Sequence, residues 1–235
     1  MKLEKTKIKN PRAFSLEDEF MKYDTDDFLY GFLRGLSTVR PPLEGEKEHR
    51  EYLPLKTYQK YKKVIAGVVG VTAKTIGNHL NRLAEKGLID EGIEVINGKD
   101  VKVLWFPVVK GRYEILEQDM VRYLLDTKSI HAIKIYIYLL NKYKWKRQKG
   151  EKYIFTKEEL ITALGYSEKT CHAEYYAMIN NIIKSFVIGE LIKIKTIKCE
   201  IENCDRYKTT ERLELVYVVE KYNEVEKLYK NKMEI

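Results

Sequence analysis

The segment from residue 70 to residue 89, GVTAKTIGNHLNRLAEKGLI, combines an apolar stripe with side chains that can bind nucleic acid. Ile76, Leu80 and Leu83 follow the spacing of a helix that buries one face. Amide and cationic side chains on the opposite face are able to hydrogen-bond to base edges and phosphates. The small and polar residues of that face are Lys74, Gly77, Asn78, Asn81 and Arg82. The residues predicted to make such contacts are Lys74, Thr75, Asn78 and Arg82.

Glycines and a threonine mark where this helix and the one before it begin and end. The stretch 55–70 has helical apolar spacing and ends at Gly70. Thr72 is the expected N-cap of the next helix, and Gly87 is its expected end. Two short helices joined by a turn that contains glycine form a helix-turn-helix. Gly77 is a poor helix former, so its presence predicts a close approach by a base or a backbone.

A β-hairpin is predicted directly after the second helix. Asn97-Gly98 lies between two alternating segments, which is a strong hairpin signal. Lys99 and Lys102 lie near its tip. A helix-turn-helix followed by a hairpin, with the pattern TxxTIxxHLxxLxxKGLI, resembles the winged-helix family over about residues 25–108. The resemblance implies that the second helix enters the major groove and that the hairpin, through Lys99 and Lys102, contacts the flanking backbone.

An acidic cluster lies at the start of an earlier expected helix, TDDFLYGFLRGLS. The carboxylates of Asp24, Asp26 and Asp27 could form part of a metal or acid–base site, but no neighbouring residues complete one. Acidic residues are favourable at the positive end of a helix, with Thr25 as the N-cap. We therefore interpret the cluster as helix capping.

The second half of the chain repeats this order of elements. Gly165-Tyr166-Ser167-Glu168-Lys169-Thr170 matches Gly70-Val71-Thr72-Ala73-Lys74-Thr75, with a glycine at the turn and a hydroxyl at the N-cap. Two strands follow, within 190–199 and 212–219. The predicted fold is α+β and mainly helical, with two tandem winged helix-turn-helix domains, 1–110 and 111–235. The predicted contacts of the second domain are Lys169, His172 and Tyr176.

Between the two repeats lies a basic segment, KYKWKRQKGEK, residues 142–152. Its lysines and arginine alternate with Tyr143 and Trp145. This composition fits a surface that contacts phosphates, and it fits a solvated loop equally well. Both alternatives stay open at this point.

The overall composition favours a soluble chain with an anionic partner. The formal net charge is +8 over 235 residues. We expect a cytoplasmic protein, because the N-terminus lacks the apolar core of a signal peptide and no stretch reaches the roughly 18 apolar residues that span a membrane. Cys171, Cys199 and Cys204 are expected to be reduced structural thiols. The sequence has no phosphate-binding glycine-rich loop and no His-x-His pair, so we expect neither an enzyme nor a cofactor.

In its size, charge and domain order the chain resembles the replication initiators of plasmids and phages. That resemblance implies binding of repeated or palindromic origin DNA by two winged helices in succession. A transcriptional regulator bound to an operator would use the same contacts, and a winged-helix docking protein is a third alternative. Double-stranded DNA is the expected partner, with a second copy of the chain or replication proteins as further candidates.

Overall fold

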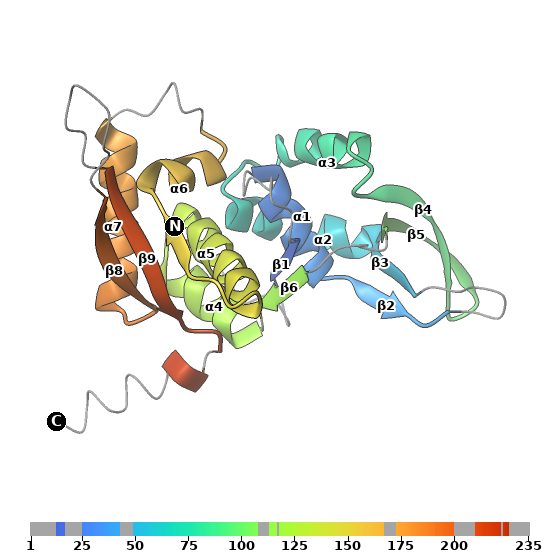
Figure 1. Cartoon of the computed structure of the whole chain (residues 1–235). Helices are drawn as coiled ribbons and strands as arrows, with labels where there is room; N and C mark the ends of the chain where they lie inside the picture. The colour runs from blue at the N-terminus through green and yellow to red at the C-terminus, as the bar shows by residue number, and fades with distance from the viewer. Residues whose placement is uncertain are drawn as a thin grey trace. The chain divides into compact units, whose positions relative to one another are not determined.

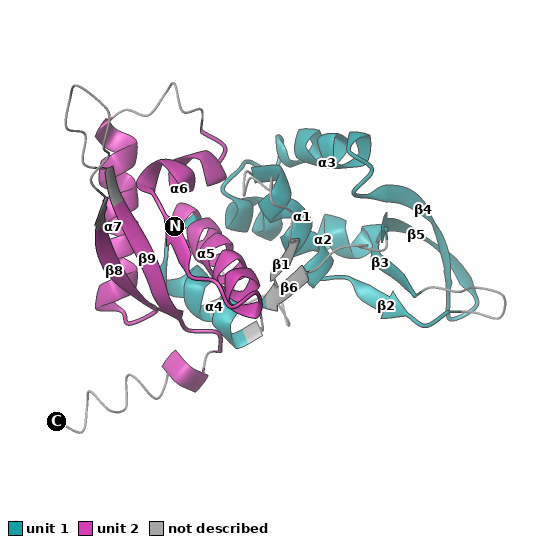
Figure 2. Cartoon of the chain, viewed as in Figure 1, with its two compact units in different colours: residues 1–130 teal, residues 131–235 magenta. Residues whose placement is uncertain are grey.

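Figure 1 shows a computed structural model of the chain, which combines helices with antiparallel sheets, as the α+β prediction requires. The structure describes residues 13–16, 25–42, 49–107, 113–116, 118–166, 173–199, 210–221 and 223–225. The chain divides into two compact units, residues 1–130 and 131–235 (Figure 2). The division lies beyond the predicted boundary near residue 110, because the strand 113–116 pairs with the strand 13–16.

Unit 1 contains helices, a four-stranded antiparallel sheet and a separate pair of strands. Its elements are β1 (Ala13–Leu16), α1 (Thr25–Gly35), β2 (Thr38–Arg40), β3 (Arg50–Pro54), α2 (Leu55–Val69), α3 (Ile76–Glu85), β4 (Asp90–Ile96), β5 (Lys99–Phe106), β6 (Tyr113–Leu116) and α4 (Gln118–Thr127). The larger sheet has the strand order β2-β3-β5-β4, and β1 pairs with β6. The strand that precedes the α2–α3 pair therefore lies beside the second strand of the hairpin that follows it.

The α2–α3 connection forms largely where the sequence predicts it. Gly70 ends α2 in the left-handed region with φ +81°, and the apolar face of α3 is fully buried at Ile76 and Leu83. However, α3 begins at Ile76 and not directly after Thr72. The Thr72 Oγ1 atom accepts a hydrogen bond from the Thr75 backbone N–H at 3.1 Å, so Thr72 caps a turn that leads into the helix.

The β4–β5 hairpin is tightened by a two-residue turn. Asn97 and Gly98 have φ values of +52° and +73°, and Ile96 pairs with Lys99 across the turn. Two successive residues with positive φ are the requirement of the turn that Asn-Gly favours, so the hairpin prediction is confirmed. Because side chains alternate along a strand, Lys99 and Lys102 lie on opposite faces of β5.

An aromatic contact fixes the larger sheet of unit 1 across three strands. Trp105 on β5 packs edge-on against Tyr52 on β3 with ring centroids 5.8 Å apart, and the Arg50 guanidinium lies 5.2 Å from the indole centroid. On β4, a Cβ atom at Gly92 would lie 2.1 Å from the Trp105 Nε1 atom. The missing side chain of Gly92 thus makes room for the indole.

Unit 2 has a helix, a strand, two helices and a hairpin, which is the order from α1 to β5 in unit 1 without the additional strand β2. Its elements are α5 (Ile130–Gln148), β7 (Tyr153–Phe155), α6 (Lys157–Ala163), α7 (Ala173–Ile188), β8 (Ile192–Cys199) and β9 (Thr210–Val218), and Figure 1 labels all of these except β7. The sheet order is β7-β9-β8, so the strand before the helix pair again lies beside the second hairpin strand. The repeat that the sequence predicts at the level of element order is present.

The central helix of unit 2 is buried more completely than its sequence suggests. A one-sided stripe would leave part of α5 exposed, yet every residue from 132 to 140 is buried. The Tyr136 hydroxyl donates a hydrogen bond to the Val219 carbonyl, and its ring packs edge-on against Phe186 at 5.7 Å. The Tyr136 contacts reach α7 and the chain after β9, so α5 serves as the core of the unit.

The start of α6 has a side-chain N-cap at Thr156. The Glu159 backbone N–H donates to the Thr156 Oγ1 atom at 3.2 Å, which is the N-cap bond. The Glu159 carboxylate instead accepts the hydroxyl hydrogens of Tyr138 and Tyr153, at 2.8 and 2.6 Å. Burial and the Glu159 charge raise the pKa of both tyrosines, so both stay neutral donors at physiological pH. Glu159 on α6 therefore bonds to both α5, through Tyr138, and β7, through Tyr153.

None of the helices in the ranges that the structure describes is long and apolar enough to cross a bilayer.

We expect Gly92→Ala to lower the free energy of unfolding by about 1–3 kcal/mol, because the added methyl group would displace the Trp105 indole. Urea unfolding followed by circular dichroism measures this change. Gly77→Ala is the matched control, since no protein atom lies within 4 Å of the Cβ position there, and it should raise stability instead. Equal stability of the Gly92→Ala variant and the wild type would contradict the packing argument.

Candidate nucleic-acid interface

The polar face of α3 and the turn before it are exposed. Lys74 and Asn78 are exposed, and neither makes an ion pair with any residue that the structure describes. Thr75 is also exposed, but its hydroxyl donates to the Thr72 carbonyl at 3.1 Å and is thus part of the turn. Lys74 and Asn78 are therefore available to an external partner, and Thr75 is available mainly through its methyl group.

Gly77 leaves the surface of α3 bare between these side chains. A Cβ atom built on Gly77 would meet no protein atom within 4 Å, so nothing in the fold requires a glycine there. A glycine inside a helix costs about 1 kcal/mol relative to alanine. An external group that approaches the helix backbone closely would account for this residue.

Arg82 points to a different partner from the one that the sequence predicts for it. Its Nε and Nη2 atoms donate to the two carboxylate oxygens of Asp26 on α1, at 2.8 and 2.9 Å. The Nδ1 atom of His79 lies 2.6 Å from the Asp26 Oδ1 atom. The Arg82 side chain keeps 46% of its surface exposed.

Asp26 is a buried carboxylate that joins α1 to α3. Only 5% of its surface is exposed, and the Lys86 ammonium lies 3.7 Å from its Oδ2 atom. Burial on its own would raise the pKa of Asp26, but the hydrogen bonds from Arg82 and His79 and the charges of Arg82 and Lys86 hold the pKa below its usual value. Helix capping alone, as predicted from sequence, does not describe Asp26.

A row of lysines on α2 is a feature that the sequence reasoning missed. Lys56, Lys60 and Lys63 are exposed and follow helical spacing, so they share one face of α2. They form no ion pair within the described part of the chain. The first helix of a helix-turn-helix crosses the phosphate backbone. The spacing of these lysines was the signal that could have identified them.

The hairpin lysines are both exposed and lie on opposite faces of the hairpin. Lys99 flanks the turn, and Lys102 pairs with Ile93. A phosphate backbone that passes along one face of the hairpin would meet one of these two side chains. The contact of both lysines with DNA stays a prediction.

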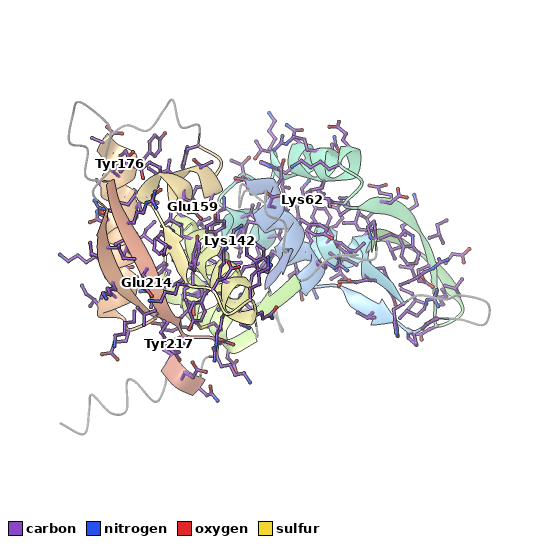
Figure 3. All side chains as sticks on the ribbon, viewed as in Figure 1. Lys62, Lys142, Glu159, Tyr176, Glu214 and Tyr217 are labelled. Carbon is purple, nitrogen blue, oxygen red and sulfur yellow. The ribbon has the colours of Figure 1, made fainter. Side chains whose placement is uncertain are left out.

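In unit 2 only one of the three predicted contacts, Tyr176, lies within the described residues. Lys169 and His172 lie outside the described residues. Tyr176 on α7 donates its hydroxyl hydrogen to the Glu158 carboxylate of α6 at 2.8 Å, and Figure 3 labels it. Exposed positions on the same helix include Ala177, Asn181 and Lys184. The described part of α7 thus offers amide groups and one cation.

The basic segment 142–152 is helical over most of its length. Residues 142–148 form the last turns of α5, so the interpretation as a loop is wrong for them. On one side of the helix Lys144 and Arg147 face Glu220, at 3.2 and 3.7 Å. Lys142, labelled in Figure 3, lies on the side that carries Trp145.

Within the described ranges no group of three or more histidine, cysteine or acidic side chains is arranged to hold a metal ion. Of the three cysteines, Cys171 and Cys204 lie outside those ranges.

Comparison with protein-family models, with curated proteins and with solved structures found no match for this chain.

We expect Asp26→Asn to lower the free energy of unfolding by about 1–3 kcal/mol at neutral pH. Removing one member of a buried ion pair is costly, and the partial exposure of Arg82 reduces that cost. Because the folded-state pKa of Asp26 is lowered, its contribution is fully present above the unfolded pKa of about 3.9. It is lost as the pH falls through the folded-state pKa. Urea unfolding between about pH 7 and about pH 3 measures the difference, which should shrink below about pH 4.

Asp119→Asn is the control for the Asp26 experiment, because Asp119 is an exposed carboxylate in the first turn of α4. This change should alter stability by at most about 0.5 kcal/mol. A stability difference for Asp26→Asn that stayed constant down to about pH 3 would contradict the charged pairing with Arg82 and His79.

Proposed function

We propose that the chain is a sequence-specific double-stranded DNA-binding protein built from two winged helix-turn-helix units. In unit 1, α3 serves as the recognition helix in the major groove, and the β4–β5 hairpin serves as the wing. In unit 2, α7 and the β8–β9 hairpin take the corresponding places. Neither a cofactor nor a catalytic role is part of the proposal.

The shared order of elements supports this proposal. Both units have a helix, a strand directly before a helix pair, and a hairpin after it, and in both the strand before the helix pair lies beside the second hairpin strand; unit 1 has β2 as an additional strand. This arrangement holds a helix pair firmly against a sheet while the second helix of the pair keeps one face in solvent. Two such modules on one chain raise affinity through effective concentration and lengthen the DNA site that is read.

The exposed face of α3 is the observation that carries the proposal. Lys74 and Asn78 flank the bare backbone at Gly77, so this face combines a cation, an amide and space for close approach. Asparagine forms a bidentate pair with adenine in the major groove, and lysine binds guanine or phosphate. The lysines of α2 supply further positive charge to the same unit, where they can bind the phosphate backbone.

We propose replication initiation as the process served, on the basis of the resemblance to plasmid and phage initiators in size, charge and domain order. A transcriptional regulator would use the same protein surfaces. The distinction lies in the arrangement of sites on the native DNA: repeated copies at an origin indicate an initiator, and one operator beside a promoter indicates a regulator.

Selection of bound duplexes from a random pool, followed by sequencing, tests the proposal. We expect enrichment of a site with two half-elements. Asn78→Ala should relax the preference at one base pair and cost about 1–3 kcal/mol at that site. Lys102→Ala and Lys99→Ala should differ in DNA affinity, since only one of the two lysines faces the phosphate backbone. Replacing that lysine should weaken binding to all sequences alike and reduce the slope of log affinity against log salt by about 1. Absence of enrichment at low salt would refute sequence-specific binding and favour a protein-docking role.

Gly77→Ala separates binding from folding. We expect this variant to be more stable than the wild type by up to about 1 kcal/mol, because alanine favours the helix and meets no protein atom. Its affinity for the selected duplex should nevertheless fall, because the methyl group occupies the space where DNA approaches. Fluorescence anisotropy with the labelled duplex measures the affinity. Unchanged or tighter binding by the more stable variant would show that Gly77 does not lie at the DNA.

A further inference from the structure

The C-terminal end of α5 presents an indole surrounded by lysines. The ammonium groups of Lys142, Lys146 and Lys149 lie 5.7, 4.9 and 3.8 Å from the centroid of the Trp145 ring. Helical spacing places these residues on one side of α5, and Trp145 itself is partly exposed. We call these four residues the Lys–Trp face.

Fewer of the lysines on the Lys–Trp face form ion pairs than do the basic residues around it. Lys144 and Arg147 pair with Glu220, and Lys152 pairs with Glu214 at 2.9 Å. On the Lys–Trp face Lys146 pairs with Glu151 at 2.6 Å. Lys142 and Lys149 form no ion pair with any residue in the described ranges. The face therefore keeps a surplus of positive charge.

Helix stabilisation accounts for only part of this arrangement. Cations in the last turn of a helix interact favourably with its free carbonyl groups, and each exposed cation–π contact adds about 0.5–1 kcal/mol. Neither effect needs several ammonium groups around one indole, where like charges repel each other. A phosphate group that approached the lysines would relieve that repulsion.

The combination of indole and lysines suits one kind of ligand. Proteins that bind unpaired nucleic acid stack bases on aromatic side chains and hold the backbone with cations. In a duplex the bases are already stacked and paired, so a duplex would use the lysines and leave the indole without a role. We propose that the Lys–Trp face binds a single-stranded nucleic-acid segment, with a base on Trp145 and phosphates at Lys142 and Lys149.

This site differs from the proposed duplex-binding surface of α3 and does not depend on it. Lys149 moves from the ring to a phosphate when a base stacks, which costs one exposed cation–π contact and replaces it with a charge pair. The Lys146–Glu151 pair can remain in place during this exchange. The chain would then hold an unpaired strand at the end of α5, in addition to the duplex proposed for the recognition helices.

Anisotropy of a labelled oligothymidylate of about 15 nucleotides, measured with the full-length chain, tests this inference. We expect Trp145→Leu to weaken binding by about tenfold and Trp145→Phe, which keeps a stacking ring, to weaken it less. Lys142→Gln/Lys149→Gln should reduce the slope of log affinity against log salt by about 1.4, as expected for two phosphate contacts on a single strand. The control Lys152→Gln/Lys221→Gln removes two exposed lysines outside the Lys–Trp face and the same charge, and it should leave the slope unchanged.

Tryptophan fluorescence gives an independent reading. The chain has two tryptophans, so quenching by the oligonucleotide that disappears in Trp145→Leu, with Trp105 still present, would support stacking on Trp145. Equal losses of affinity in the Lys142/Lys149 variant and the Lys152/Lys221 control would overturn the proposal. If the Lys142/Lys149 variant lost affinity only for the selected duplex, the proposal would be overturned as well, because the Lys–Trp face would then contact a duplex backbone. Asn78→Ala should leave oligothymidylate binding intact, so a failure of the α3 assignment is distinguishable from a failure here.

Discussion

The buried carboxylate of Asp26 is the interaction on which the geometry of unit 1 depends. It accepts hydrogen bonds from Arg82 and lies against His79, both on α3, while itself belonging to the first turn of α1. A buried charge is stable only when it is paired, so the orientation of α3 is restricted to positions that keep these bonds. This fixes which face of α3 is turned toward the core and which is left for a partner.

That restriction divides the polar residues of α3 into two groups. Arg82 and His79 satisfy Asp26, whereas Lys74 and Asn78 remain exposed beside the open surface at Gly77. A polar face read from sequence alone assigns all of these side chains to one role. The distances show that part of the face holds the helix in place, and the rest of the face is exposed.

The two units share an order of elements but present different surfaces. In unit 1 the exposed lysines and the amide lie on the helix pair, on α2 and α3. In unit 2 the Tyr176 hydroxyl on α7 is bound to Glu158, and positive charge collects at the end of α5 around Trp145. A shared order of elements therefore carries surfaces of different chemistry, which is the physical basis for proposing a single-strand site at the end of α5 in addition to the duplex-binding helices.

The sequence by itself determined the features that depend on neighbouring residues. The end of α2 at Gly70, the Asn97-Gly98 turn and the N-cap bond at Thr156 follow from local backbone preferences and short-range hydrogen bonds. Only the tertiary structure decided the roles of Asp26 and Arg82, which are 56 residues apart, and the complete burial of residues 132–140 in α5. It also decided that Glu220 neutralises one side of the basic segment and leaves the Trp145 side charged. Long-range pairing depends on which elements pack together, and neither residue type nor spacing specifies that packing.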